Sequence, residues 1–181
     1  MSQRPIDADN HYYEPLDAFT RHLPKEFKQR GVRPVQSGKR VELLREAVPR
    51  ARRLAVLSNT DHSGDAEELR VTREAASRFG LEVRHFPATA PAAIDQALAD
   101  IAAARMDAVM VHPDQLMVQT REAIARFSMA QRMPTISGWA TIADAGGLMT
   151  YGPVLSECYR RLAYFADRIL RGVKSADLPI E

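Results

Sequence analysis

The chain has 181 residues, of which 45% are apolar and 27% are charged, and its net charge is +2 at neutral pH. These values are typical of a soluble protein with one well-cored domain and an appendage. The only cysteine, Cys158, excludes an internal disulfide and a metal site made of several thiolates, and no apolar run reaches the roughly 20 residues that a membrane-spanning helix needs.

The beginning of the chain lacks the apolar core and the small-residue cleavage site of a signal peptide, so the chain as written is expected in the cytoplasm. Its basic residues alternate with acidic residues and prolines and form no patch with interleaved aromatic residues. We therefore expect no binding of nucleic acid.

Two parts of the chain differ in their residue patterns. Residues 1–40 show no sustained apolar period, and four prolines interrupt any long helix there. Residues 41–181 alternate between short apolar runs and amphipathic stretches. The sequence therefore predicts an irregular N-terminal segment over 1–40, followed by one α/β domain over 41–181.

The α/β domain is expected to contain strands and helices in regular alternation. In chain order they are a strand at Arg53–Ser58, a helix at Asp65–Phe79, a strand at Leu81–Phe86, a helix at Pro91–Arg105, a strand at Met106–Val111, a helix at Val118–Arg132, strands at Thr135–Ser137 and Leu148–Tyr151, and a helix at Val154–Arg171. Short βα connections make right-handed crossovers. The predicted fold class is α/β, a doubly wound parallel sheet of about five strands in the order 2-1-3-4-5.

Four polar loops follow the predicted strands, where ligands of open α/β sheets collect. They are residues 58–64, 112–115, 137–139 and 146–152. All four are rich in hydrogen-bonding side chains and three of them contain glycines, as suits a pocket for a small polar molecule. None contains Lys or Arg, so a zwitterionic amino acid or a small carboxylate suits them better than a phosphate or a polyanion.

Single residues of these loops allow two interpretations. Ser63 is a candidate N-cap for the next helix, whose free N–H groups would then meet a ligand carboxylate. Alternatively, Ser63 only caps the helix and Asn59 only makes a turn. Tyr151 lies between glycines beside a strand end, which favours stacking on a ligand.

Signals for catalysis or for a cofactor are weak. Neither glycine motif of nucleotide sites is present. His112 and Asp114 share one loop, but such a pair is more often a turn or a ligand contact than an acid-base pair, and Cys158 is expected to be a structural thiol. The sequence predicts no enzyme activity and no cofactor.

Residues 43–181 resemble the substrate-binding proteins of ABC transporters for amino acids and similar solutes. The most specific match is Ala-Gly-Gly-Leu-Met-Thr-Tyr-Gly-Pro at 145–153. The resemblance implies a periplasmic-binding-protein-like fold with two lobes that close on a ligand, of which this chain is the C-terminal lobe, and an ABC permease as partner where the protein is exported, as relatives are. It also implies the ligand-facing positions: Asn59, Thr60, Asp114, Ser137 and Tyr151.

In that two-lobed family the last helix would reach toward the other lobe. Its apolar side, including Leu162, Phe165 and Ile169, would then lack its usual cover here. Exposed apolar patches of this kind favour self-association. We therefore expect weak homodimers, or an N-terminal segment folded back over this helix.

Residues 4–40 resemble the beginning of metal-dependent amidohydrolases related to decarboxylases. In that family the first strand carries a metal-binding pair, matched here by Asp9 and His11. Two ligands do not complete a hydrolytic zinc site, which needs at least three. A fused N-terminal remnant, with metal-dependent hydrolysis or decarboxylation as the alternative function, stays open at this point.

Overall fold

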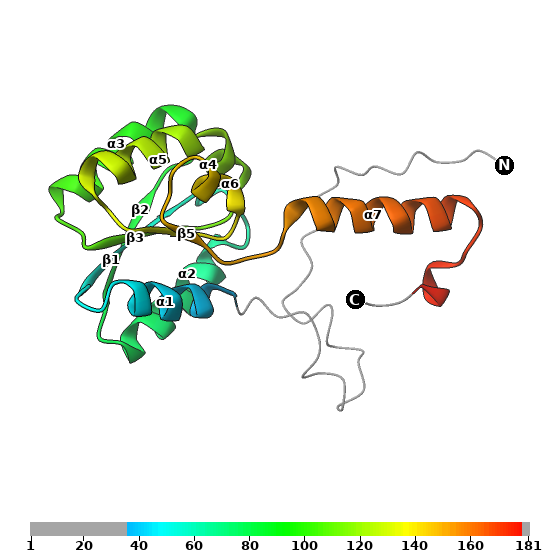
Figure 1. Ribbon diagram of the computed structural model, residues 1–181, viewed down its shortest axis with the longest axis horizontal. Coiled ribbons are helices and arrows are strands. Elements are labelled where there is room, and N and C mark those ends of the chain that lie inside the picture. Colours follow the sequence, from blue (N-terminus) through cyan, green and yellow to red (C-terminus); the bar gives the residue numbers. More distant parts are fainter. Residues whose placement is uncertain (1–35, 179–181) are drawn as a thin grey trace. The chain divides into compact units, whose positions relative to one another are not determined.

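Five parallel strands form one sheet in the computed structural model, which describes residues 36–178 (Figure 1). The strand order is β2-β1-β3-β4-β5, and every neighbouring pair is parallel. The bounds are β1 (Arg53–Ser58), β2 (Glu82–Pro87), β3 (Ala108–Val111), β4 (Thr135–Ser137) and β5 (Met149–Thr150). The predicted fold class and strand order are confirmed.

Helices cover both faces of this sheet (Figure 1). Their bounds are α1 (Gln36–Ala47), α2 (Asp65–Arg78), α3 (Pro91–Ala103), α4 (Gln115–Gln119), α5 (Arg121–Gln131), α6 (Ala140–Asp144) and α7 (Leu155–Leu170), followed by a 3₁₀ turn at Ser175–Asp177. One core packs α1 and α2 against the sheet, and a second core packs α3, α4, α5 and α6 against its other face.

The central strand β1 shows why the sheet is covered twice. Its side chains alternate between the two cores: Leu54 and Val56 face α1 and α2, whereas Ala55 and Leu57 face α3 and α5. All four are completely buried. Burying a Leu or Val side chain stabilises the fold by about 1.5–3 kcal/mol. An apolar run with no polar alternation therefore requires helices on both sides.

Two features of the helices were not predicted from the sequence: the helix α1, and the division of one predicted helix into two. Helix α1 begins at Gln36 and ends at Ala47, so residues 40 and 41, where the sequence predicted the start of the α/β domain, both lie within this helix. The single helix predicted over Val118–Arg132 is two helices, α4 and α5. They meet at Thr120, whose hydroxyl donates to the carbonyl of Leu116.

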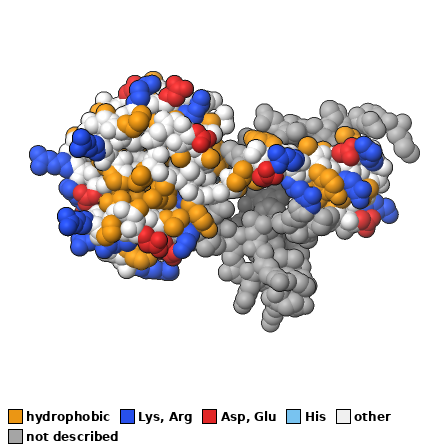
Figure 2. Space-filling view, in the orientation of Figure 1, with side chains coloured by type: hydrophobic (Ala, Val, Ile, Leu, Met, Phe, Trp, Pro, Cys, Tyr) orange, Lys and Arg blue, Asp and Glu red, His pale blue; other side chains and the backbone are white. Residues whose placement is uncertain are grey.

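Helix α7 differs from the other long helices because its apolar side chains are exposed. Tyr159, Leu162 and Leu170 are 67%, 63% and 78% exposed, and Phe165 is half-buried. Apolar side chains reach the surface of this helix between its arginines (Figure 2). Within residues 36–178, none of the helices combines the length and the apolar character that crossing a membrane requires.

Candidate ligand-binding edge of the sheet

The carboxyl ends of β1 and β3 are joined by a side-chain hydrogen bond. Asn59 Nδ2 donates to Asp114 Oδ1 over 3.1 Å. The same carboxylate oxygen accepts the backbone N–H of Leu116 over 2.8 Å and so caps α4. Asn59 Oδ1 accepts the N–H of Asp61 over 3.0 Å, which is the turn interaction expected of this residue type. Asn59 therefore makes a turn and also reaches the neighbouring loop.

The ends of β4 and β5 are joined through the backbone. The N–H of Tyr151 donates to the carbonyl of Ser137 over 2.9 Å. The hydroxyl of Ser137 is buried and donates to the carbonyl of Trp139 over 2.8 Å. Tyr151 is 41% exposed. We call the loops at these four strand ends, residues 59–60, 112–114, 137–139 and 151–152, the carboxyl edge.

Two predicted residues after β1, Thr60 and Ser63, are exposed. The prediction that Ser63 caps α2 is wrong: the N-cap is Gly64, and no side chain accepts a hydrogen bond there. Backbone carbonyls of the preceding turn already engage the N–H groups of Asp65 and Glu68. The first helical turn also carries three carboxylates, which oppose an anionic group at this position.

Within the carboxyl edge, the side chain of His112 forms a buried pair with Asp65 of α2. His112 Nδ1 lies 3.1 Å from Asp65 Oδ1, and His112 Nε2 lies 3.3 Å from the hydroxyl of Thr72. Burial alone would raise the pKa of Asp65, but hydrogen bonds from His112 and Ser58 outweigh it, so that the pKa is lowered. Thr72 has no exposed surface, so the hydroxyl–imidazole–carboxylate series is sealed from any substrate and is structural.

His85 extends this polar cluster to the edge strand β2. Its Nε2 lies 2.8 Å from Ser58 Oγ and 3.9 Å from Asp65 Oδ2. Burial lowers the pKa of His85 despite the nearby Asp65 carboxylate. One ring nitrogen of His85 faces both oxygens, which differs from the arrangement of a serine hydrolase triad, where the base uses its two nitrogens separately.

Arg40 is the functional candidate that the sequence prediction missed. Its side chain is only 2% exposed, and its guanidinium donates to Ser37 Oγ over 2.8 Å, to Glu68 Oε1, and to the carbonyl of Tyr151 over 3.4 Å. Burial lowers the pKa of Arg40, and Glu68 opposes that change. The sequence did contain a signal for this helix. Ser37, Arg40, Val41 and Leu44 follow one another at helical spacing, and in the structure all four lie on the buried face of α1.

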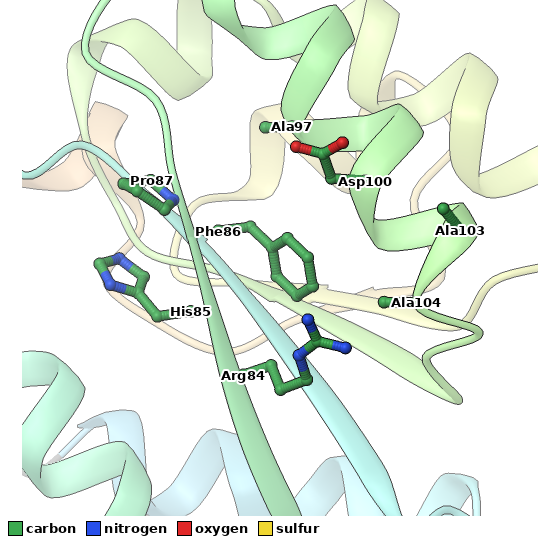
Figure 3. Close-up of a pocket in the computed structure, with 8 residues that line it drawn as sticks. All are labelled: Arg84, His85, Phe86, Pro87, Ala97, Asp100, Ala103 and Ala104. Carbon is green, nitrogen blue, oxygen red and sulfur yellow. The ribbon is translucent and has the colours of Figure 1, made fainter.

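One hollow lies away from this edge, between β2 and α3, with a volume of about 540 Å³. The side chains of Arg84 and Phe86 lie on the side of β2 that faces Asp100 and Ala97 of α3 (Figure 3). The side chain of His85 lies on the opposite side of β2. The guanidinium of Arg84 lies 5.5 Å from the centre of the Phe86 ring. A second hollow, of about 430 Å³, lies between α5 and α6. Neither of these two hollows is lined by a predicted site residue.

Metal binding has no site among residues 36–178, where no group of three or more His, Cys, Asp or Glu side chains is placed to hold an ion. Asp9 and His11, the metal pair of the alternative prediction, lie outside the described residues.

A family profile described as "ABC transporter substrate binding protein" matches residues 31–181. The chain belongs to this family. The profile begins within the segment of residues 4–40, and the resemblance of that segment to amidohydrolases is not supported. No curated protein sequence matches the chain.

Three solved structures share the fold. An ABC domain in complex with L-Trp from Streptococcus pneumonia superposes with a TM-score of 0.71 at 17% identity, covering 81% of this chain and 49% of that one. A conserved domain protein from Vibrio cholerae superposes with a TM-score of 0.71 at 18% identity, covering 78% of this chain and 48% of that one. The open, ligand-free substrate binding protein CD0873 from Clostridium difficile superposes with a TM-score of 0.60 at 22% identity, covering 79% of this chain and 48% of that one. The chain spans about half the length of these structures.

Proposed function

We propose that the chain is a lobe that binds a small solute, an amino acid or a small carboxylate, at the carboxyl edge. Membership of the substrate-binding family supports this proposal, as does the fold shared with a domain that was solved in complex with L-Trp. An ABC permease is the partner that we propose for the bound state.

The observation that carries the proposal is the Asn59–Asp114 bridge between β1 and β3. Both hydrogen bonds that Asp114 accepts within residues 36–178 go to Oδ1, which leaves Oδ2 for a ligand ammonium group. A carboxylate held in this way loses little rotamer entropy when a ligand binds, because its orientation is already fixed. Charge-assisted hydrogen bonds of this kind are among the strong ones.

The other end of the carboxyl edge offers an aromatic surface. Tyr151 is exposed at the end of β5, with its backbone fixed on both sides by Ser137 and Arg40. An apolar or aromatic ligand side chain would pack on this ring. The ligand class that we propose is therefore an amino acid whose ammonium group faces Asp114 and whose side chain faces Tyr151.

A single lobe makes only part of the contacts of a clamshell site, and it excludes water poorly because it cannot close. We propose that the carboxyl edge works opposite a second lobe and binds weakly alone. The chain's share of its structural neighbours, about half, supports this proposal.

Calorimetric titration of the full chain with each proteinogenic L-amino acid and with small carboxylates tests the function. Asp114→Asn keeps a side-chain oxygen for the cap and removes the charge. We expect it to weaken binding of the tightest amino acid by roughly tenfold or more, as for loss of one hydrogen bond to a charged group.

The matched control is Asp100→Asn, the same change in the hollow between β2 and α3, where Asp100 accepts from Gln96 over 2.8 Å. It should leave affinity unchanged. Loss of binding in Asp100→Asn with full binding in Asp114→Asn would move the site to the hollow. Absence of binding by the unmodified chain at millimolar ligand would refute the ligand class.

A further inference from the structure

The buried guanidinium of Arg40 touches three separate parts of the chain. Ser37 belongs to its own helix, Glu68 to α2, and the carbonyl of Tyr151 to the segment that leaves β5 toward α7. Ser37 also donates to Glu68 Oε1 over 2.7 Å. Arg40, Ser37 and Glu68 are therefore each hydrogen-bonded to the other two. A planar guanidinium has donors in a fixed fork, which suits contacts in several directions at once.

Two glycines show how closely the backbone packs against this cluster. A Cβ atom on Gly138 would lie 2.6 Å from Arg40 Nη1, and a Cβ atom on Gly152 would lie 1.8 Å from the carbonyl oxygen of Gly138. The guanidinium therefore lies directly under the loop after β4, and the segment after β5 crosses over that loop. Neither position has space for a side chain.

The cluster continues under the other half of the carboxyl edge. Glu68 Oε2 lies 4.0 Å from His112 Nδ1, the same nitrogen that contacts Asp65, and Asp65 approaches His85 at the end of β2. A series of buried and partly buried polar groups thus connects the backbone carbonyl of Tyr151 with Ser58 at the end of β1. Buried polar groups that are hydrogen-bonded to one another have one preferred arrangement, since any displacement leaves a partner unsatisfied.

We propose that Arg40 is a positioning residue of the carboxyl edge: it fixes the backbone of Gly138 and of Tyr151–Gly152 and so sets the direction in which the chain leaves the sheet for α7. Arg40 itself touches no ligand, because it is buried beneath these loops. The consequence for ligand binding rests on the proposed function, whereas the hold on the backbone does not.

Arg40→Lys separates positioning from a general contribution to stability. An ammonium group keeps the charge beside Glu68, but as a single point it does not span Ser37, Glu68 and the Tyr151 carbonyl together. The reporter is hydrogen exchange of the Tyr151 amide, which donates to Ser137, measured on the full chain without ligand. The reference is the His112 amide, which donates to Leu57 in the other half of the edge.

In Arg40→Lys we expect exchange of the Tyr151 amide to accelerate by roughly tenfold or more, with little change at His112, because a local opening affects only its own region. Lys39→Met, on the exposed side of the same helix, should change neither amide. Equal acceleration at both amides in Arg40→Lys would show a global role only, and no acceleration at Tyr151 would show that Arg40 does not hold the segment. Either result overturns the proposal.

Glu68→Gln is the second variant in case Arg40→Lys does not fold. The amide oxygen of the new side chain still accepts from Arg40, but the ion pair is lost. Relative to the unmodified chain, exchange of the Tyr151 amide should therefore again accelerate more than exchange of the His112 amide. Titration of these variants with L-tryptophan tests the link to function. Binding by the unmodified chain that Arg40→Lys leaves intact would refute that link, whereas absence of binding by the unmodified chain would count against the proposed ligand class and leave the exchange result standing.

Discussion

The two halves of the carboxyl edge are held in different ways. The β1–β3 half is tied by loop side chains near the surface, with Asn59 and Asp114 bonded to each other. The β4–β5 half is held from below, by a buried guanidinium from a helix more than 100 residues earlier in the chain. Partly exposed hydrogen bonds contribute modestly to stability, whereas breaking a buried ion pair is costly. We therefore expect the bridge between the loops after β1 and β3 to contribute less to stability than the buried contact that holds the β4–β5 half.

The largest expected effect is that of Arg40→Met, which leaves Glu68 without its buried cation. Removing one partner of a buried ion pair typically costs about 3–5 kcal/mol, and we expect a loss of free energy of unfolding in this range, measured by urea denaturation. Lys39→Met is the control on the same helix and should change little, because its ion pair with Glu42 is exposed. A loss no greater than that of the control would break the distinction between the two halves.

Gly152→Ala tests the close backbone crossing of the β4–β5 half. The added Cβ meets the carbonyl of Gly138, so the loop has to move, and overpacking of this kind costs about 1–3 kcal/mol. Gly38→Ala is the matched control in the first turn of α1, since its Cβ would meet only the Ala75 side chain, at 3.8 Å. Thermal denaturation should show a lower Tm for the first variant and an equal or higher Tm for the second; the reverse order would contradict the packing.

Asp114→Ala addresses the β1–β3 half. It removes the N-cap of α4 and the bond from Asn59, and loss of such a cap costs about 1 kcal/mol. Asp114→Asn should recover most of this stability, because asparagine caps as well as aspartate does. Chemical denaturation of the two variants side by side is the measurement. An alanine variant as stable as the native chain would show that this bridge does not hold the loops.

The smallest effect is a pH dependence that originates at His85. Burial lowers its pKa below the ordinary value of 6.5, so the unfolded chain binds a proton at a higher pH than the folded chain does. Stability from this residue is therefore full above pH 6.5 and falls as the pH drops from 6.5 toward the folded pKa. His85→Gln should flatten this part of a stability–pH curve. An unchanged slope in the variant would assign the effect to another group.

The strands could be predicted from sequence because each is a short run whose burial pattern is local. Arg53–Ser58 and Thr135–Ser137 match their predicted bounds. Gly80 follows Phe79, the C-cap of α2, and adopts a φ of +66°, a conformation that favours glycine at the end of a helix. These features depend only on neighbouring residues, so they are visible in the sequence.

The supports of the carboxyl edge could not be predicted in the same way. Arg40 was assigned to an irregular segment, because its partners Glu68 and Tyr151 are distant in sequence. Ser63 was predicted as a cap from its residue type, but the turn places Gly64 at that position. A residue type shows what a side chain can do, whereas the packing of distant elements decides whether it does so.

The most direct test of the account is an NMR titration of the isotope-labelled full chain with the L-amino acid that binds most tightly in calorimetry. Ligand binding at the carboxyl edge predicts the largest shift changes at the amides of Asn59, Asp114 and Tyr151, with little change at Arg84 and Asp100 in the hollow between β2 and α3. Changes concentrated at the hollow, or none at the three edge residues under saturating ligand, would contradict the assignment of the site.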